Sequence, residues 1–533
     1  MTLLRLWKRT YCGPLALALA LSLSAGCDSG ETAASADDAG TSPTADLAPP
    51  QPDLLPPRPP FDWLAFVGTG QSLSVGVASG AVLSKDTNTP HRKLQYAGPD
   101  PCNPFDGRGT FSLVPLVEPI RSGLSCAALG GEYPANIQGE TPHSAFAKQL
   151  SILLAQDGGP DVPELHSVVG WSGRAIQFIN KAGGGKGYPG SLSEGAQFKQ
   201  AAMAAGKTLG YGAVLLTHGE SDAANTMYGQ QVLKLAQDYE QDLQKLTGQS
   251  AGIPMLLSQQ NTFPTGPGRA PSTIAQWQVG VDHPGKVVCT GPKYQYQYAA
   301  DKIHLLSAGY VQLGQKYAQV FYEVGIQSRS WQPLQPLSAM RSGAVITLKF
   351  HVPVPPLVFE ESISSPHQTA NTQWKDGRGF EVEDSTGALT IVSARIVQPD
   401  SVELQLDKAP TGTGLLVRYA MTQEATGAHG GDDLGRRGQL RDSDPFTGYD
   451  RETLSCQVTG GSTDVTVTGS LTARAVKDLV SGDKLAPGTR IAAIPAANRL
   501  TLSKPWTGTT GAASLVAWHD QYNYAVAFEL PVK

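Results

Sequence analysis

The chain has few charged residues and no long basic or apolar runs. Only 16% of its 533 residues are charged, and the formal net charge is −5. No basic run could neutralise a row of phosphates, so nucleic acid is not expected as a partner. The apolar run at 15–23 is too short to span a bilayer, and no later segment is expected to span one. No His, Cys, Asp or Glu spacing is typical of a metal site, so neither a metal nor a cofactor is expected.

The sequence has few cysteines, and the position of each one in the sequence predicts its role. Cys12 lies in the basic and apolar N-terminal segment, which has the layout of a secretory signal. Cys102 and Cys126 bracket a loop rich in Pro and Gly, so we expect a disulfide between them in an oxidising compartment. Two further cysteines are expected to be buried thiols, namely Cys289 and Cys456.

The first 60 residues are expected to be a leader and a tether. Residues 1–26 form the signal, and small residues precede Cys27 in a pattern that resembles a bacterial lipoprotein box. Acylation of Cys27 would anchor the protein in the cell envelope, with the lipid as its only membrane contact. The alternative is an ordinary signal peptide and a secreted protein. Residues 27–60 are rich in Pro, Ala and Asp, and they predict a disordered tether.

The remaining chain is too long for one core, and its pattern changes near residue 330. Residues 61–330 alternate short apolar runs with amphipathic segments, which predicts an open parallel α/β sheet flanked by helices. The expected strands are 63–67, 165–169, 213–216, 253–257 and 286–289, and the expected helices include 143–155, 194–209 and 230–246.

An all-β region is expected after residue 330. Apolar and polar residues alternate at 344–350, 390–397, 401–406 and 415–419, which predicts a sandwich-like domain over 331–454 that is completed by 518–533. Residues 455–517 are rich in Thr, Gly and Ala and are interpreted as an inserted β-module. Such a module could bind sugar, act as a spacer or have no catalytic part. The acidic stretch 429–433 is interpreted as a solvated turn.

Three short motifs each follow an expected strand or precede an expected helix. In open α/β sheets, ligands bind beyond the carboxyl ends of the strands, so these motifs should meet at one rim. A serine hydroxyl becomes a nucleophile when an imidazole takes its proton and a carboxylate orients that imidazole. Ser72, His304 and Asp301 supply these three groups. The motifs are Gly70-Gln71-Ser72, His218-Gly219-Glu220-Ser221 and Asp301 to His304.

Alternatives remain for single residues. Ser72 could be only the N-cap of a helix, and Ser172 is a rival nucleophile that lacks the final glycine spacing of an elbow motif. His218 could merely cap a strand end. Glu220 could orient its neighbours or contact sugar hydroxyls, and we favour the first role. Ser307 is expected to cap the helix that follows His304.

The ordered motifs resemble those of SGNH hydrolases, and within them the sialate O-acetylesterase-like carbohydrate esterases. The resemblance covers about residues 61–325 and implies an acetylated carbohydrate as substrate. His218 departs from the pattern, because that family usually has glutamine there. A lipid or aryl esterase on the same fold and a non-catalytic carbohydrate-binding envelope lipoprotein stay open, and no oligomeric state is indicated. The roles implied are catalysis for Ser72, His304 and Asp301, oxyanion binding for Ser72, Gly173 and His218, and support for Gln71 and Glu220.

Overall fold

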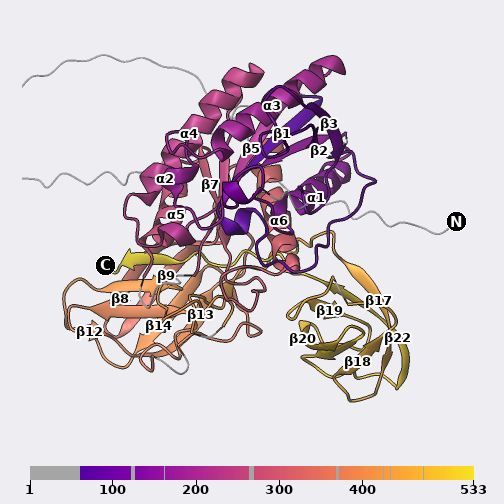
Figure 1. The fold of residues 1–533 in the computed structure, drawn as a ribbon. Coiled ribbons are helices and arrows are strands. Elements are labelled where there is room, and N and C mark those ends of the chain that lie inside the picture. Colours follow the sequence, from indigo (N-terminus) through magenta and orange to yellow (C-terminus); the bar gives the residue numbers. More distant parts are fainter. Residues whose placement is uncertain are drawn as a thin grey trace, which may run out of the picture. The chain divides into compact units, whose positions relative to one another are not determined.

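The fold is that of a computed structural model (Figure 1), which describes residues 61–121, 126–160, 162–262, 269–367, 371–423, 425–432, 434–471 and 473–533. The expected signal, Cys27 and the tether lie outside these residues. Within the described part of the chain, no helix has the length and apolar character needed to cross a membrane.

A seven-stranded sheet lies at the centre of the N-terminal half, as the alternating pattern predicted. Its order is β3-β2-β4-β1-β5-β6-β7, and all neighbours are parallel except the β2–β3 pair. All five expected strands are present. The β2–β3 hairpin was not predicted, because its residues are largely half-buried or exposed. The strands are β1 Trp63–Gly70, β2 Arg92–Ala97, β3 Thr110–Pro115, β4 Glu164–Val168, β5 Leu209–Thr217, β6 Met255–Gln259 and β7 Val287–Pro292.

Helices cover both faces of this sheet, and β1 shows why. Ala65 and Val67 belong to the core that includes α3 and α4, whereas Leu64 and Phe66 belong to the core that includes α1 and α6. Side chains alternate between the faces of a strand, so a continuous apolar run fills two cores. The helices are α1 Pro142–Gln156, α2 Ile176–Ile179, α3 Gly187–Ala204, α4 Tyr228–Thr247, α5 Pro271–Asp282 and α6 Ser307–Phe321.

The C-terminal half is antiparallel β structure. Two four-stranded sheets, β12-β11-β15-β23 and β13-β14-β9-β8, face each other through aromatic rings such as Phe350 and Phe380, whose centroids are 6.4 Å apart. β23 pairs with β15, so the last residues of the chain complete the first sheet as expected. The strands are β8 Gln335–Ser342, β9 Val345–His351, β11 Phe380–Asp384, β12 Gly387–Ala388, β13 Ile391–Gln398, β14 Ser401–Leu406, β15 Leu416–Tyr419 and β23 Phe528–Pro531, with the small pair β10 Val358–Phe359 and β16 Leu440–Arg441 beside them.

The segment interpreted as an insertion contains a closed six-stranded barrel. Its order is β17-β18-β21-β20-β19-β22, and closure leaves no open sheet edge. The first barrel strand begins at Glu452, slightly before the expected boundary at 455. The division into separate domains stays a prediction, since residues 52–533 form one compact unit. The strands are β17 Glu452–Val458, β18 Asp464–Val467, β19 Leu479–Ser481, β20 Thr489–Ala496, β21 Arg499–Leu502 and β22 Gly511–Trp518.

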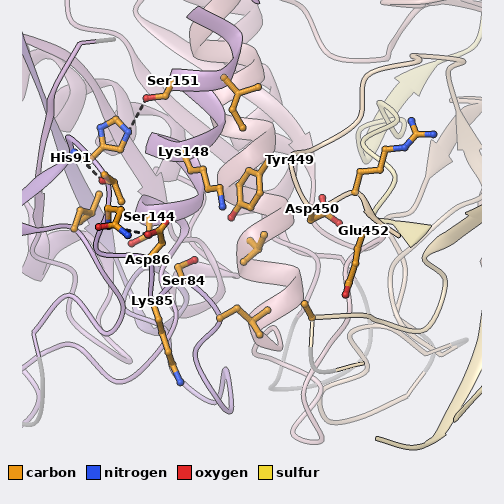
Figure 2. A pocket seen from close by; sticks show the side chains of 18 of the residues that line it. Ser84, Lys85, Asp86, His91, Ser144, Lys148, Ser151, Tyr449, Asp450 and Glu452 are labelled. Atoms are coloured by element: carbon orange, nitrogen blue, oxygen red, sulfur yellow. Dashed lines mark hydrogen bonds between the residues drawn. The ribbon is translucent and has the colours of Figure 1, made fainter. Parts of the chain in front are cut away.

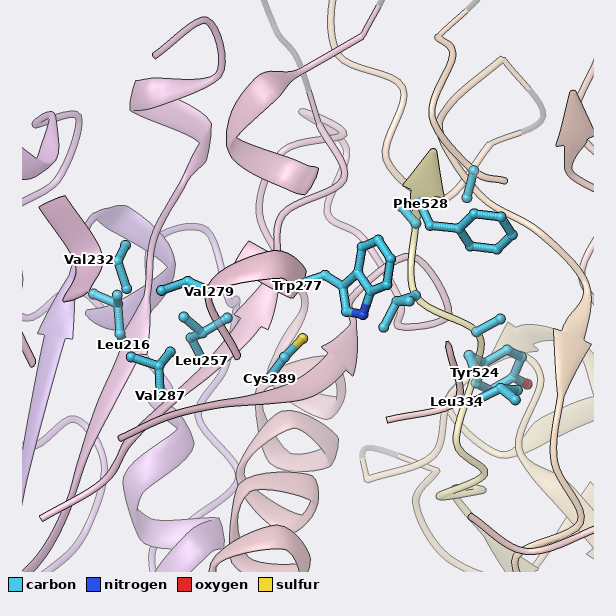
Figure 3. Close-up of a cluster of buried hydrophobic side chains, with 14 of the residues drawn as sticks. Leu216, Val232, Leu257, Trp277, Val279, Val287, Cys289, Leu334, Tyr524 and Phe528 are labelled. Atoms are coloured by element: carbon cyan, nitrogen blue, oxygen red, sulfur yellow. The ribbon is translucent and has the colours of Figure 1, made fainter. Parts of the chain in front are cut away.

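One hydrophobic cluster joins the α/β sheet to the β sandwich. Trp277 of α5 lies between them (Figure 3), with its ring centroid 6.4 Å from that of Phe528 on β23. Its indole N–H donates to Gln335 Oε1 at 2.8 Å. A buried indole needs both an apolar surrounding and a partner for its N–H, and this position supplies both.

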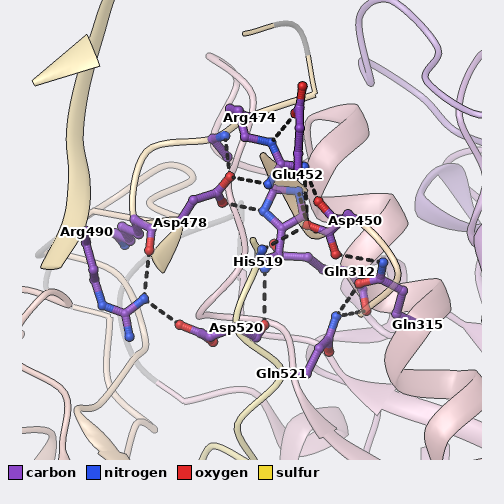
Figure 4. A network of polar contacts seen from close by, with 12 residues as sticks. Gln312, Gln315, Asp450, Glu452, Arg474, Asp478, Arg490, His519, Asp520 and Gln521 are labelled. Carbon is purple, nitrogen blue, oxygen red and sulfur yellow. Dashed lines mark hydrogen bonds and ion pairs between the residues drawn. The ribbon is translucent and has the colours of Figure 1, made fainter. Parts of the chain in front are cut away.

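A buried network of ion pairs near the barrel is hydrogen-bonded to α6 through Gln315 (Figure 4). Asp450 accepts from Gln315 Nε2 of α6 at 3.0 Å and from the His519 amide at 2.9 Å. The His519 ring bonds to Asp478, and Arg474 pairs with Asp478 at 3.4 Å. Burial by itself would lower the pKa of His519. The neighbouring carboxylates of Asp478 and Asp450 raise this pKa by more, so it lies above its usual value. The buried charges at this junction are therefore paired with charges of opposite sign.

A pocket of about 480 Å³ lies where α1 faces the start of the barrel (Figure 2). Lys148 Nζ lies 4.5 Å from the ring centroid of Tyr449, and the Tyr449 amide donates to Gln149 Oε1 at 2.9 Å. The pocket lining includes none of the predicted catalytic residues.

The cysteines behave as predicted within the described residues. Cys102 and Cys126 form a disulfide, with Cα atoms 5.8 Å apart. Cys289 and Cys456 are buried free thiols. Burial raises the pKa of Cys289 to about 12, so its thiol is not reactive.

Candidate active site

The turn that carries Ser72 is held against the end of β5. Gly70 has φ +138°, and a Cβ there would lie 2.1 Å from the Thr217 carbonyl oxygen, so only glycine fits. The Gln71 amide donates to the same oxygen at 3.1 Å. Ser72 begins a short 3₁₀ turn directly after β1 and is 6% exposed.

Ser72 does not cap this turn through its side chain. The N-cap is Gln71, and no side-chain capping bond is present. Among the residues that the structure describes, the Ser72 hydroxyl has no hydrogen-bond partner. The alternative in which Ser72 is only a helix cap is therefore wrong.

Asp301 and His304 meet within one tight loop. The His304 amide donates to Asp301 Oδ1 at 3.0 Å, and His304 Nδ1 lies 2.6 Å from Asp301 Oδ2. Lys302 between them has φ +59°, and the Ala299 amide donates to the His304 carbonyl at 2.8 Å. Because a carboxylate only accepts, His304 Nδ1 is assigned as the donor and Nε2 as the basic nitrogen.

Electrostatics keep Asp301 ionised. Burial raises the pKa of Asp301, but the hydrogen bonds from the His304 ring and the His304 and Ile303 amides outweigh it and leave a pKa below the usual value. The charged carboxylate can therefore orient the imidazole. His304 Nε2 is buried and has no hydrogen-bond partner among the described residues.

The segment after Ser72 lies against the helix after His304. The Val77 amide donates to the Ser72 carbonyl at 3.2 Å, and the Tyr310 hydroxyl of α6 donates to the Val77 carbonyl at 2.9 Å. The Ser307 hydroxyl donates to the Ser79 carbonyl at 2.9 Å. Ser307 is thus not the N-cap of α6, which is Leu306. Its hydroxyl instead joins the two motifs.

Ser72 follows β1 and His304 follows β7, two strands of the same sheet, but no hydrogen bond joins the Ser72 hydroxyl to the His304 ring within the described residues. Catalytic hydrogen bonds are often long in ligand-free enzymes and tighten when substrate binds. The observed pair is therefore Asp301 with His304.

The turn that contains Gly173 lies beside the Ser72 turn. The Trp171 amide donates to the Gly70 carbonyl at 2.9 Å, and the Arg174 amide donates to the Trp171 carbonyl at 3.3 Å. Gly173 has φ +70° in the third position of this turn, which is typical of a type II turn. Gly173 is exposed, and its amide has no acceptor among the described residues.

The structure contradicts the predicted role of His218 as a donor in the oxyanion hole. Its side chain is fully buried, its Nε2 lies 2.9 Å from the Arg174 carbonyl oxygen, and its Nδ1 lies 2.9 Å from the Tyr228 hydroxyl. A carbonyl only accepts, so Nε2 carries the proton and Nδ1 accepts from Tyr228. Burial lowers the pKa of His218 more than Asp222 raises it, which favours the neutral ring. Its single N–H is engaged and cannot donate to an oxyanion.

His218 instead fixes the backbone next to Gly173, and this gives a prediction. We expect His218→Ala to lower kcat by about 10- to 100-fold, because misplacement of a catalytic turn has effects of this size. His218→Gln should retain more activity, since its amide N–H can donate to the Arg174 carbonyl. Tyr228→Phe is the matched control for the other ring nitrogen. Steady-state kinetics on the folded variants measure these effects. A wild-type kcat for His218→Ala would show that His218 does not hold the Gly173 turn in place.

Gln71 and Glu220 connect the motifs in the interior. Gln71 Oε1 accepts from the Ser221 amide at 2.9 Å. Glu220 pairs with Lys293 at 2.8 Å, and both side chains are almost fully buried. This burial supports the favoured orienting role of Glu220 over contact with sugar hydroxyls, and that role stays a prediction. The sequence interpretation missed Lys293, although a lysine at the end of a fully buried strand indicates a buried partner.

The acidic stretch 429–433 lies against the catalytic loop. The Gly430 amide donates to the Lys302 carbonyl at 2.8 Å, and Gly430 is buried. Gly430 and Gly431 do lie in a turn, and His429, Gly431 and Asp432 are partly exposed, so the interpretation as a solvated turn is wrong only for Gly430. Asp433 lies outside the described residues. Over the described ranges, no three His, Cys, Asp or Glu side chains are arranged to hold a metal.

Comparison with known proteins gave structural likenesses only. No family model matches the chain, and no curated protein matches it. A carbohydrate acetylesterase from Xanthomonas citri is 16% identical, with a TM-score of 0.43 and coverage of 72% of this chain and 81% of that one. A protein from Arabidopsis thaliana is 18% identical, with a TM-score of 0.33 and coverage of 50% and 100%. NanS is 12% identical, with a TM-score of 0.29 and coverage of 49% and 97%.

Proposed function

We propose that the chain is a serine esterase that removes acetyl groups from a carbohydrate. The observation that carries this proposal is the Asp301–His304 pair, with Nδ1 bonded to the carboxylate at 2.6 Å and Nε2 without a partner among the described residues. Ser72 begins a turn at the same rim. A nucleophile, a base and an orienting carboxylate are the groups that acyl transfer requires.

The reaction follows from these groups. Ser72 Oγ attacks the ester carbonyl carbon while its proton moves to His304 Nε2. The tetrahedral intermediate collapses, the bond to the sugar oxygen breaks, and His304 returns the proton to the leaving hydroxyl. Water then attacks the acetylated Ser72, its proton moves to His304, and acetate leaves as Ser72 recovers that proton. Asp301 stays ionised and holds the imidazolium.

Two backbone amides are the proposed oxyanion donors. The Ser72 amide lies at the start of a 3₁₀ turn, and Gly173 is an exposed residue of the adjacent turn. Preformed donors stabilise the charge that develops on the carbonyl oxygen, and the loss of one typically lowers the rate by about 10²- to 10³-fold. His218 acts on this site only through the Arg174 carbonyl.

A panel of esters tests the proposal. Acetate release from acetylated xylan and a small acetyl ester, and acid release from a long-chain ester, are measured for wild type, Ser72→Ala and the control Ser193→Ala on α3. A sugar esterase should act on the acetylated polymer in a Ser72-dependent way and favour it over the long-chain ester. Preference for the long-chain ester would indicate a lipid esterase. No Ser72-dependent turnover on any ester would reject an enzyme and leave a binding protein.

The location is a separate proposal from the sequence. We expect Cys27→Ser to release the protein from membranes, because acylation of Cys27 is the proposed anchor. Activity per molecule should persist, since Cys27 lies outside the proposed site. Cell fractionation of both forms measures this. A Cys27→Ser protein that still sediments with membranes would contradict the lipid anchor.

A further inference from the structure

A cavity of about 210 Å³ lies beside the loop that carries Asp301 and His304. Lys302, between those two residues in the chain, lines this cavity, whereas none of the predicted catalytic residues does. Distant segments supply further lining, including Gly430 and residues 475–478, directly before β19. The volume is below that of pockets for drug-sized molecules, so the cavity suits a small ligand.

Lys477 lines this cavity, and its side chain has no hydrogen-bond or ion-pair partner among the described residues. Burial lowers the pKa of Lys477 to about 8, and the guanidinium groups of Arg437 and Arg490 lower it as well. The carboxylates of Asp520 and Glu360 raise this pKa, but by less. The positive charge of Lys477 is therefore poorly balanced by the protein around it.

Three other lysines are buried in the described part of the chain, and each has a partner within the protein. Lys93 Nζ donates to two carbonyl oxygens at 2.8 and 3.1 Å, and Lys316 Nζ donates to a carbonyl oxygen at 2.7 Å. Lys293 pairs with Glu220 at 2.8 Å. Lysines are almost never buried unless they are paired, so the lack of a partner sets Lys477 apart.

The two carboxylates that line the cavity are already paired (Figure 4). The His519 ring bonds to Asp478, and Arg490 donates to Asp520 Oδ2 at 2.6 Å. The Lys302 side chain, by contrast, has no partner among the residues that the structure describes. Within those residues, the two lysines of the lining are therefore the charges that lack a counter-ion.

We propose that this cavity binds a small oxyanion, namely a carboxylate or a phosphate group, through Lys302 and Lys477. A desolvated ammonium group gains from a counter-ion, and charge-assisted hydrogen bonds to carboxylate or phosphate oxygens provide one. Acetate and inorganic phosphate are two sources of this chemistry. An anion bound here contacts the loop of Asp301 and His304 without occupying the Ser72 site, and its binding does not depend on the proposed esterase function.

Calorimetry on the intact protein tests the site. Sodium acetate and sodium phosphate are each titrated into wild type, Lys302→Met, Lys477→Met and the control Lys186→Met, with sodium chloride holding the ionic strength constant. Lys186 is exposed and also has no side-chain partner among the described residues. We expect each cavity variant to bind the anion at least about 10-fold more weakly than wild type, the usual worth of a hydrogen bond to a charged group. Lys186→Met should bind as wild type does.

The two anions distinguish the ligand. Tighter binding of acetate would assign the site to a carboxylate, and tighter binding of phosphate would assign it to a phosphate group. No binding by wild type, or equal affinities in wild type and both cavity variants, would overturn the inference. Neither result bears on Ser72, which does not line this cavity.

The pH dependence of acetate binding gives a second measurement. The charged form of Lys477 attracts the anion, so the affinity of wild type should fall as pH rises above about 8, the pKa of this lysine. The fall is at most about 10-fold per pH unit. Acetate itself stays ionised over this range. An affinity that does not change between about pH 7 and 9 would contradict binding through Lys477.

Acylation of wild-type amines, located by mass spectrometry of peptides, covers the case in which a variant fails to fold. At an anion concentration of about ten times the dissociation constant, acylation of Lys477 should slow about 10-fold, because only the unoccupied site reacts. Acylation of Lys186 should not change. Equal rates for Lys477 with and without the anion would reject the site.

Discussion

Ser72→Ala and His304→Ala are each expected to lower kcat by at least about 10³-fold with the fold intact. Both side chains belong to one proton-transfer unit, so the loss of either stops the same step. The double variant Ser72→Ala/His304→Ala should therefore be little worse than either single variant. Steady-state kinetics on a small acetyl ester and circular dichroism spectra measure activity and folding.

Asp301→Asn serves as the graded member of this series. The asparagine variant keeps the nucleophile and the base, so it should leave more activity than Ser72→Ala. A double variant much worse than either single variant would show that Ser72 and His304 act in separate steps. Full activity in Ser72→Ala would move the nucleophile elsewhere.

Lys293→Met is expected to destabilise the folded chain by about 3–5 kcal/mol, because it leaves a buried carboxylate without its counter-charge. Lys293 Nζ lies 2.8 Å from Glu220 Oε1, and both side chains are almost fully buried. Desolvation of an unpaired charge is one of the few single-residue effects of this size. Urea unfolding followed by tryptophan fluorescence measures the change in midpoint.

The control for this prediction removes both charges. Glu220→Gln/Lys293→Met should unfold at a higher urea concentration than Lys293→Met alone, since no charge stays buried without a partner. An exposed pair on the α/β region supplies the comparison, and Lys286→Met, which breaks the Lys286–Glu240 contact at 3.2 Å, should have little effect. A wild-type midpoint for Lys293→Met would show that Glu220 is not held by this lysine.

The strands and helices of the α/β region could be predicted because their signal is local. A strand that is buried on both faces is a continuous apolar run, and a helix that is buried along one stripe has apolar residues three or four positions apart. The five expected strands therefore lie near their observed positions. The β2–β3 hairpin was missed, because its apolar residues are few and mixed with polar ones. The closure of the barrel and the pairing of β23 with β15 join segments that no local pattern relates.

The sequence by itself determined the chemistry that is local to one turn. Asp301 and His304 are three residues apart, and the loop between them is enough to bring carboxylate and imidazole into contact. Tertiary structure alone decided the role of His218, because its Nε2 bonds the carbonyl of Arg174, 44 residues away in the sequence. It also decided the partner of Glu220, which is Lys293, 73 residues away. The physical reason is that a buried polar group takes whichever partner the packed interior places beside it, and distant segments supply that partner.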